Sequence, residues 1–163
     1  MNRQGSKTAS VLYVVFLLSS EYYGVDMKDT HRVLPMDALT RVPKMPSFFK
    51  GTVNLRGMRV PVLDLRMKLG IQTTKQTAES RIVIVNTAGR DVGFVVDAVT
   101  GVLPVPMSSI EPVTTPGTQG NYLSGIAVLD SRQVSLLDLD KVFSVFNGNI
   151  STVPISNEPT PVR

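Results

Sequence analysis

Apolar and polar residues alternate most clearly between residues 51 and 69. The apolar positions of this alternation are Val53, Leu55, Met58, Val60 and Val62. A period of two is typical of half-buried strands, and Arg56-Gly57 interrupts it where glycine can supply a positive φ. The pattern therefore predicts a β-hairpin that turns at Arg56-Gly57. Asp64 follows the second strand and is predicted to cap a short helix over residues 65–69.

A second copy of this pattern spans residues 125–143, at a shift of 74 positions (125 − 51 = 74). The matched pairs are Gly51/Gly125, Leu55/Leu129, Val60/Val134, Leu63/Leu137, Asp64/Asp138 and Leu65/Leu139. Upstream, a shift of 69 (93 − 24 = 69) gives a further set. These pairs are Gly24/Gly93, Val33-Leu34-Pro35/Val102-Leu103-Pro104 and Pro43/Pro112. The sequence thus contains an internal repeat of two copies, and the second copy has about five extra residues.

The remaining apolar runs are short and predict further strands. They cover residues 11–18, 22–27, 33–36, 82–85, 92–96 and 99–105. Prolines mark residues 39–49 as a connection, a polar stretch at 71–80 reads as a linker, and residues 107–122 read as a loop.

Many short strands separated by turn signals predict an all-β sandwich or barrel. Each copy offers five candidate strands, so we expect two similar five-stranded barrels, roughly residues 11–70 and 80–146. Residues 1–10 and 147–163 are predicted to be flexible tails, because the first is polar and the second is rich in proline and poor in apolar residues.

Composition sets outer limits on the class of protein. The chain has 163 residues, 42% of them hydrophobic, and no cysteine, which excludes disulfides, thiolate metal ligands and a thiol nucleophile. The longest apolar run, residues 11–18, is far shorter than the roughly 20 residues of a membrane-spanning helix. No segment has the order of a secretion signal. We therefore expect a soluble, cytoplasmic protein that is not inserted in a membrane.

The net charge of +4 is unevenly distributed. Residues 41–68 contain one acid, Asp64, and seven cations, namely Arg41, Lys44, Lys50, Arg56, Arg59, Arg66 and Lys68. Such a face can meet nucleic acid, anionic lipid or an acidic protein, or can simply be a solvated surface. Nucleic acid is disfavoured because Phe48-Phe49 is the only aromatic pair near these cations.

Candidate catalytic chemistry is sparse. His31 is the only histidine, which excludes a histidine-based metal cluster, and no glycine loop of the phosphate or dinucleotide type is present. Asp64 and Asp138 resemble a carboxylate pair, yet their matching positions in the two copies favour helix capping. We therefore predict no catalytic residue, no metal and no cofactor, and a small hydrolase is the weakest hypothesis.

Outward positions differ between the copies while the core positions match. Asp130-Ser131 replaces Arg56-Gly57, so the fold does not require arginine and glycine at the turn. An exposed arginine on a rigid turn suits recognition of a carboxylate or backbone carbonyls, although an ordinary solvated arginine also fits. The further differences are Arg59 against Gln133 and Arg66 against Asp140. They predict a basic surface on the first copy and a more neutral or acidic one on the second.

Three stretches resemble the motifs of one protein family. FFKGTVNLRGMRVPVLDLRMKLG, Phe48 to Gly70, closely resembles the central motif of the CheW family of chemotaxis coupling proteins. DVGFVVDAVTGVLPV, Asp91 to Val105, and NYLSGIAVLDSRQVSLLDLDKVF, Asn121 to Phe143, resemble its second and third diagnostic stretches. The resemblance runs from about Val11 to Phe146. It implies two intertwined five-stranded Src-homology-3-like barrels with short helical turns, a CheW-like domain over residues 11–146.

The resemblance also implies partners and contact residues. Family members are adaptors that join the regulatory domain of the histidine kinase CheA to the cytoplasmic tip of methyl-accepting chemoreceptors. The receptor-binding positions predicted here are Thr30, Val33, Gly51, Val53, Arg56, Gly57 and Val99. Those predicted to bind the kinase are Arg32, Arg66 and Asp140. At the position of Thr30, family members often carry an aliphatic residue. At the position of Arg32, many carry Glu. For the three valines, a place in the core is the competing interpretation.

The predicted function is a non-catalytic adaptor recruited to membrane receptor arrays. One alternative is a basic β-barrel module that binds nucleic acid, which a salt titration distinguishes because phosphate contacts weaken steeply with salt. Another is a divergent CheW-like adaptor in a non-chemotactic motility or regulatory pathway.

Overall fold

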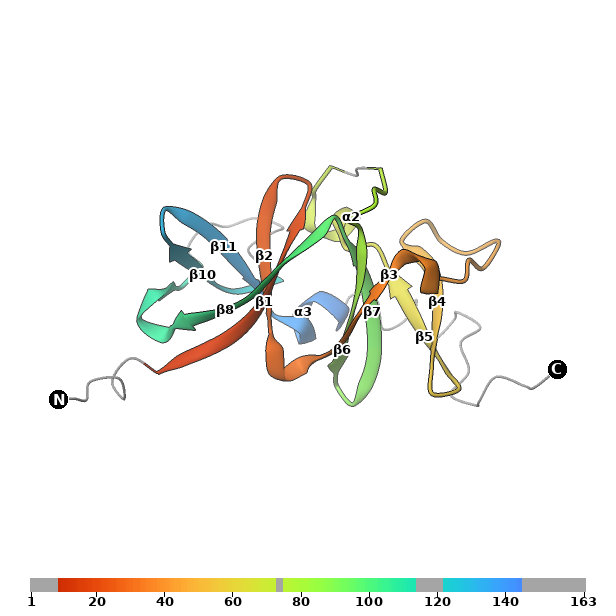
Figure 1. Ribbon diagram of the computed structural model, residues 1–163, viewed down its shortest axis with the longest axis horizontal. Coiled ribbons are helices and arrows are strands. Elements are labelled where there is room, and N and C mark those ends of the chain that lie inside the picture. Colours follow the sequence, from red (N-terminus) through yellow and green to blue (C-terminus); the bar gives the residue numbers. More distant parts are fainter. Residues whose placement is uncertain (1–8, 73–74, 114–121, 145–163) are drawn as a thin grey trace.

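The computed structural model describes residues 9–72, 75–113 and 122–144 (Figure 1). The first copy contributes β1 (Ser10–Leu18), β2 (Glu21–Asp26), β3 (Thr30–Pro35), β4 (Phe49–Leu55), β5 (Met58–Leu63) and the short helix α2 (Arg66–Leu69). The second contributes β6 (Arg81–Thr87), β7 (Arg90–Val96), β8 (Ala98–Pro106), β9 (Ile110–Glu111), β10 (Leu123–Leu129), β11 (Arg132–Leu137) and α3 (Leu139–Ser144). In the described residues, strands are also linked by the 3-10 turns η1 (Met27–Asp29), η2 (Met36–Ala38) and η3 (Met107–Ser109). The all-β class expected from the sequence is confirmed.

The strands form two sheets that exchange elements between the copies. One sheet has the order β8-β1-β2-β11-β10-β9 and the other β3-β6-β7-β5-β4. The β1–β2 hairpin of the first copy lies between strands of the second, and the β6–β7 hairpin of the second lies between strands of the first. Each sheet therefore contains strands from both copies. The halves are intertwined, because each copy completes the other's sheet.

The glycines that match between the copies lie where a strand of one copy pairs with a strand of the other. Gly24 on β2 pairs with Leu136 on the parallel strand β11, and Gly93 on β7 pairs with Val62 on the parallel strand β5. A Cβ at Gly24 would lie 3.2 Å from the Leu136 side chain, and one at Gly93 only 2.7 Å from the Ile84 side chain. Side chains of the neighbouring strands therefore favour glycine at both positions: at Gly24 those of the parallel strand β11, and at Gly93 those of the antiparallel strand β6 together with Val62 of the parallel strand β5.

Both equivalent hairpins turn through two residues with positive φ. The φ values are 53° and 81° at Arg56 and Gly57, and 47° and 61° at Asp130 and Ser131. Two successive positive φ values are what a type I′ turn requires, and this turn matches the twist of the flanking strands. In the first copy the Asn54 side-chain oxygen also accepts the Gly57 N–H at 3.0 Å. The predicted turns are confirmed.

The predicted cap Asp138 is confirmed by a hydrogen bond, whereas the N-cap residue of α2 is Leu65, which makes no side-chain cap bond, and Asp64 lies one residue before it. The Asp64 carboxylate accepts the backbone N–H of Arg66 at 3.0 Å, and the Asp138 carboxylate accepts that of Lys141 at 3.2 Å. Each bond satisfies a donor that would otherwise be unpaired at the start of a short helix.

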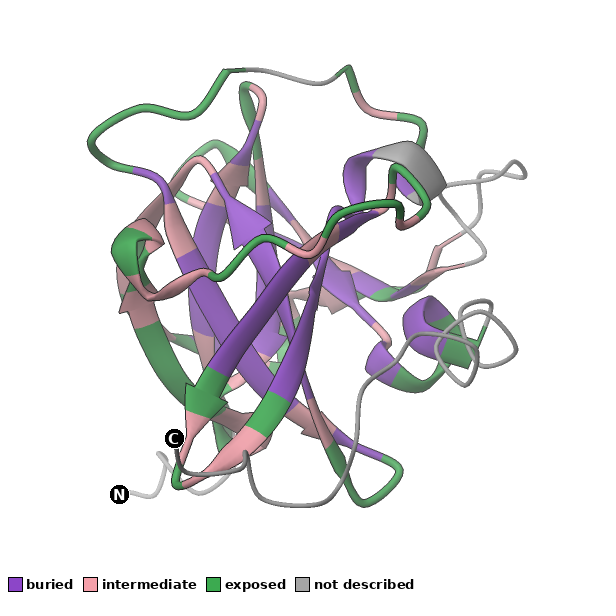
Figure 2. Cartoon of the chain, turned by 90° about the vertical axis from the view of Figure 1, so that its right-hand side faces the viewer, coloured by how far each residue is buried: buried purple, intermediate pink, exposed green. Residues whose placement is uncertain are grey.

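The largest apolar cluster lies where the two sheets and both helices meet, and Figure 2 shows buried residues running along the central strands. Phe16 of one sheet packs on Phe94 of the other with ring centroids 5.3 Å apart, and Phe143 of α3 packs on Phe94 at 6.3 Å. Each sheet also has a smaller cluster of its own, one around Val62 and Ile82 and one around Val15 and Leu136.

The structure corrects the sequence-based picture at two places. The segment at 107–122, read as a loop, contains η3 and the short strand β9, which pairs with β10; residues 114–121 lie outside the described part. The expected N-terminal tail ends one residue early, since β1 begins at Ser10, and residues 1–8 and 145–163 are not described. Within the described ranges, no helix is long and apolar enough to cross a bilayer.

Candidate docking surfaces

A surface depression brings together three predicted contact residues, Thr30, Arg32 and Arg56. Its volume is about 530 Å³, and β3, the β4–β5 hairpin and β7 form its walls. The full lining is Thr30, His31, Arg32, Leu55, Arg56, Met58 and Asp91. The pairing of β3 with β6 shifts register between Thr30 and Arg32, so His31 is the extra residue of a bulge. Residues predicted for receptor and for kinase therefore share one surface.

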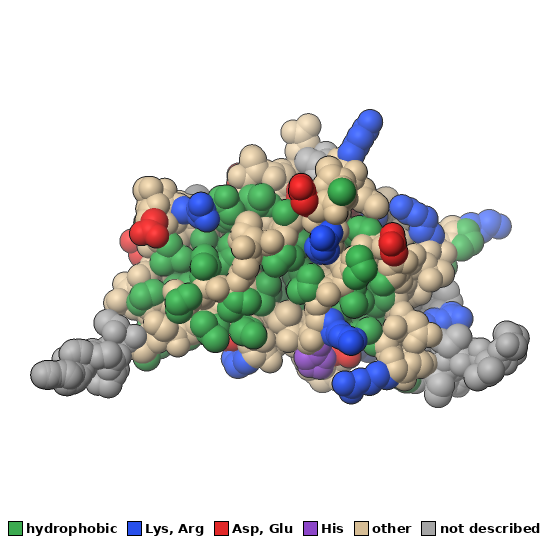
Figure 3. Space-filling view, in the orientation of Figure 1, with side chains coloured by type: hydrophobic (Ala, Val, Ile, Leu, Met, Phe, Trp, Pro, Cys, Tyr) green, Lys and Arg blue, Asp and Glu red, His purple; other side chains and the backbone are tan. Residues whose placement is uncertain are grey.

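The lining of the depression combines basic and apolar side chains. Arg32 and Arg56 are exposed, and neither forms an ion pair within the described part of the chain. The carboxylate of Asp91 lies 3.1 Å from Nδ1 of His31 and accepts a hydrogen bond from the Asn86 amide at 3.0 Å. Figure 3 shows this histidine, in purple, beside basic side chains. Two unpaired arginines next to apolar side chains suit a partner with acidic and apolar groups.

Three further lining residues of this surface, Leu55, Met58 and Asp91, were not predicted from the sequence. Leu55 and Met58 belong to the alternating pattern, but their half-buried state at the hairpin end was not foreseen. Asp91 is far from His31 in sequence, and only the pairing of β7 with β6 and of β6 with β3 brings the two together. His31 itself is at the surface, as expected, with 48% of its side chain exposed.

Two predicted receptor contacts are interior residues. Val53 is 1% exposed and packs in the cluster of its own sheet, so the prediction that it lies at a binding surface is wrong. Gly51 is buried at a register shift between β4 and β5, with φ of 146°. A Cβ there would lie 2.2 Å from the Thr40 carbonyl oxygen. The packing of the β3–β4 connection against β4 therefore accounts for this glycine.

The remaining predicted receptor residues differ in exposure. Val33 on β3 is 42% exposed, and Val99 on β8 is half-buried against the central cluster opposite Phe16. Gly57 is half-buried in the β4–β5 turn. Their contact with a receptor stays a prediction.

Arg66 does not face outward, contrary to the expectation from the repeat. Its side chain is 5% exposed, with Nη1 3.4 Å from the Asp64 carboxylate and Nη2 bonded to the Asp97 carboxylate. Asp97 follows β7 and also accepts the backbone N–H of Ser19 at 2.5 Å. Strand alternation ends at Leu63, so it cannot give the direction of a side chain beyond the capped turn. Arg66 ties three chain segments together and is not available as a direct docking residue.

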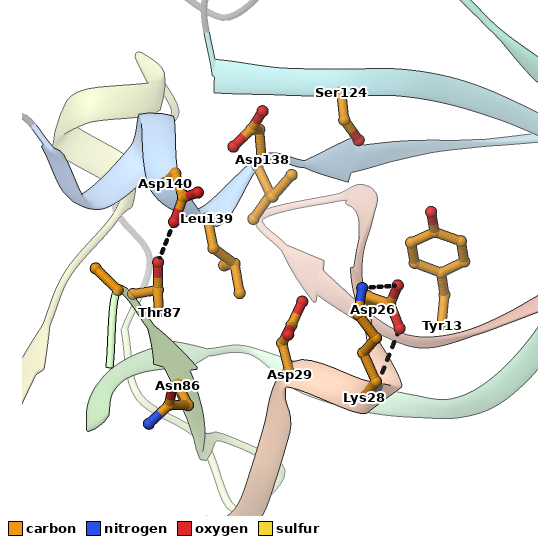
Figure 4. A pocket seen from close by; sticks show the side chains of 12 residues that line it. Tyr13, Asp26, Lys28, Asp29, Asn86, Thr87, Ser124, Asp138, Leu139 and Asp140 are labelled. Atoms are coloured by element: carbon orange, nitrogen blue, oxygen red, sulfur yellow. Dashed lines mark hydrogen bonds and ion pairs between the residues drawn. The ribbon is translucent and has the colours of Figure 1, made fainter. Parts of the chain in front are cut away.

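Asp140 lies in a different pocket, of about 460 Å³, at the junction of the two sheets and α3 (Figure 4). Its carboxylate accepts a hydrogen bond from the Thr87 hydroxyl at 2.6 Å, which links α3 to the end of β6. The other acidic residues lining this pocket are Asp26, Asp29 and Asp138. Asp140 is exposed, as predicted, and its contact with a kinase stays a prediction. Among the described residues, no group of side chains is arranged to hold a metal ion.

The two equivalent turns lie at opposite ends of the molecule. Figure 1 shows β4 and β5 at the right end and β10 and β11 at the left end. Arg56 and Asp130 are both exposed, as are Arg59 and Gln133 on the adjacent strands. The turns thus present opposite charges on matching backbone geometry, in agreement with the expected divergence between the copies.

Comparison with known proteins decides the family. The sequence pattern of the CheW-like domain matches residues 12–146, which is most of the chain. The chain belongs to the CheW-like family. Chemotaxis protein CheW of Klebsiella aerogenes is 32% identical over 148 residues, covering 88% of each protein, and that of Bacillus subtilis is 33% identical, covering 79% of this chain and 84% of its relative.

A solved structure supports the same assignment of the fold. The scaffolding protein TtCheW from Thermoanaerobacter tengcongensis superposes with a TM-score of 0.76 at 37% sequence identity. The match covers 82% of this chain and 92% of TtCheW. The two-sheet CheW-like arrangement is therefore the fold of a known scaffolding protein.

Proposed function

We propose that this protein is a non-catalytic adaptor that couples methyl-accepting chemoreceptors to a CheA-like histidine kinase in a signalling array. Membership of the CheW-like family supports this role, because the relatives above are chemotaxis proteins and the solved neighbour is a scaffolding protein. The adaptor acts in the cytoplasm and is recruited to membrane receptors through its partners.

The observation that carries the proposal is the depression between β3 and the β4–β5 hairpin. Arg56 stands on a rigid two-residue turn, and Arg32 lies across the same depression with no acidic partner among the described residues. Leu55 and Met58 supply an apolar part of the lining. A helix from the receptor tip fits this arrangement if it places apolar side chains on this part and an acidic side chain against Arg56.

The adaptor needs a second contact for the kinase. Two exposed regions do not line the depression. They are the surface of α3 around Asp140 and the Asp130-Ser131 turn. We propose that the regulatory domain of the kinase binds there, so that receptor and kinase bind together.

The test replaces Arg56 by alanine and uses Arg59→Ala as a matched control, since Arg59 is an exposed arginine on the same hairpin that does not line the depression. Both variants should unfold within about 0.5 kcal/mol of the wild type, because exposed side chains contribute little to stability. Arg56→Ala should lose co-sedimentation with receptor-containing membranes and lose receptor-stimulated kinase activity, whereas Arg59→Ala should keep both.

Intact coupling in Arg56→Ala would rule out this surface as the receptor contact. If the wild type bound neither receptor nor kinase in a pull-down but bound nucleic acid with a steep salt dependence, the adaptor proposal itself would be wrong.

A further inference from the structure

A second cavity, of about 210 Å³, lies between the β3–β4 connection, β4 and the residues that lead into β6. It is lined by Met36, Arg41, Lys50, Asp64, Arg66, Gln76, Ser80 and Val95. It shares no lining residue with the depression of the proposed function. From the sequence, Arg41 and Lys50 were recognised only as part of a basic stretch.

The cavity has an excess of positive charge. The lining cations are Arg41, Lys50 and Arg66 and the lining carboxylate is that of Asp64; Arg66 is already paired with Asp64 and with Asp97. Arg41 is exposed and Lys50 is half-buried, and in the described segments neither forms an ion pair. Two cations therefore line the same cavity without an ion-pair partner in the described part of the chain, and an anion there would have both as partners.

Buried hydrogen-bond donors beside the cavity also lack an acceptor within the described ranges. The Nη atoms of Arg66 bind two aspartates, but its buried Nε has no hydrogen-bond partner among the described residues. Ser80 is 2% exposed, and its oxygen accepts the backbone N–H of Thr77 at 2.9 Å, so its hydroxyl proton is available for donation. Buried donors in folded proteins are normally satisfied, and the missing partner here is an acceptor.

We propose that this cavity binds a small tetrahedral oxyanion of the phosphate type. Arg41 and Lys50 supply the ionic contacts, Ser80 and Gln76 supply neutral donors, and Arg66 forms the cationic wall. A cavity of 210 Å³ holds several water-sized volumes of about 30 Å³, so an ion of phosphate size fits with part of its hydration.

The bound anion would contact residues from both copies of the repeat. The cations come from the first copy, and Ser80 leads into β6 of the second. A ligand that binds only the folded arrangement stabilises it in proportion to the logarithm of its concentration over its dissociation constant.

The experiment measures binding of inorganic phosphate by isothermal titration calorimetry and by thermal unfolding, with sodium chloride at equal ionic strength as the reference. The wild type should bind about one phosphate per chain and show a saturable rise in Tm. Sulfate should compete, because it is also tetrahedral, and acetate should compete poorly. Lys50→Met and Arg41→Gln should each weaken binding at least tenfold, and Arg59→Gln, an exposed cation outside the cavity, should change it less than twofold.

Phosphate also stabilises proteins without binding, through exclusion from their surface. A Tm rise without saturation, equal in all four proteins and without heat of binding, would overturn the proposal. So would saturable binding that neither cavity variant weakens. The receptor surface takes no part in this test, so its outcome is independent of the proposed coupling function.

Discussion

The role of Gly51 can be tested by adding a single methyl group. Alanine at this position has to adopt a φ near 146° and places its Cβ 2.2 Å from the Thr40 carbonyl oxygen. Because this contact is with backbone, side-chain rotation cannot relieve it. The chain must move away, which breaks the two backbone hydrogen bonds between Thr40 and Thr52, at 2.7 and 2.8 Å.

The expected cost has two parts. A non-glycine residue in this region of φ costs about 1–3 kcal/mol. Each lost backbone hydrogen bond contributes a net cost of about 0.5–1.5 kcal/mol, so the pair adds about 1–3 kcal/mol. Gly51→Ala should therefore lower the free energy of unfolding by about 2–6 kcal/mol.

Gly101 provides a matched control. It has φ of 145°, and a Cβ there would meet no heavy atom within 4 Å. Gly101→Ala should therefore carry the conformational cost alone. The difference between the two variants, about 1–3 kcal/mol, isolates the clash with Thr40.

Urea denaturation followed by far-ultraviolet circular dichroism measures this difference, and the chain's four tyrosines give an independent fluorescence probe. For a chain of this size each kcal/mol corresponds to about 2–4 °C in Tm, so a thermal scan should agree. If Gly51→Ala were no less stable than Gly101→Ala, the steric explanation would fail. A loss of receptor coupling in a stable Gly51 variant would instead restore it as a contact residue.

Three further predictions concern stability. Arg66→Met should cost about 3–5 kcal/mol in urea denaturation, because it leaves two aspartates near the interior without their counter-charge; a loss below 1 kcal/mol would contradict the buried ion-pair assignment. Asp138→Ala should cost about 0.5–2 kcal/mol through loss of the α3 cap, and an unchanged midpoint would show that the cap is unimportant. Burial, with the neighbouring Glu21 carboxylate, raises the pKa of Tyr23, so its contribution to stability is full below pH about 10 and falls as the pH rises further. Tyr23→Phe should remove that alkaline loss, and an unchanged pH profile of the Tm would refute the assignment.

The local features could be read from the sequence because they depend on neighbouring residues. Alternation predicted the β4–β5 hairpin, and Arg56-Gly57 and Asp130-Ser131 were placed correctly at its turn and at that of its repeat. The strand β9 was missed, since two residues carry too little pattern and prolines flank the segment.

The candidate surface could be predicted only in part. The divergence between the copies pointed to Arg56, and its exposure agrees with that interpretation. Arg66 also differs between the copies but does not face outward, because the turn after Leu63 directs its side chain toward Asp97. Val53 was assigned to a binding surface from the family resemblance, whereas the alternation of β4 places it on the apolar face that packs in the core.

The sequence by itself determined that the chain has two related halves, where most strands lie and where they turn, because short-range alternation and the conformational needs of glycine set these features. Only the tertiary structure decided that each half completes the other's sheet, since pairing of distant strands depends on the free energy of the whole packed core. The same pairing put His31 beside Asp91 and Arg66 between two aspartates. Contacts between residues so far apart in sequence leave no periodic signal, and they define both the docking depression and the basic cavity.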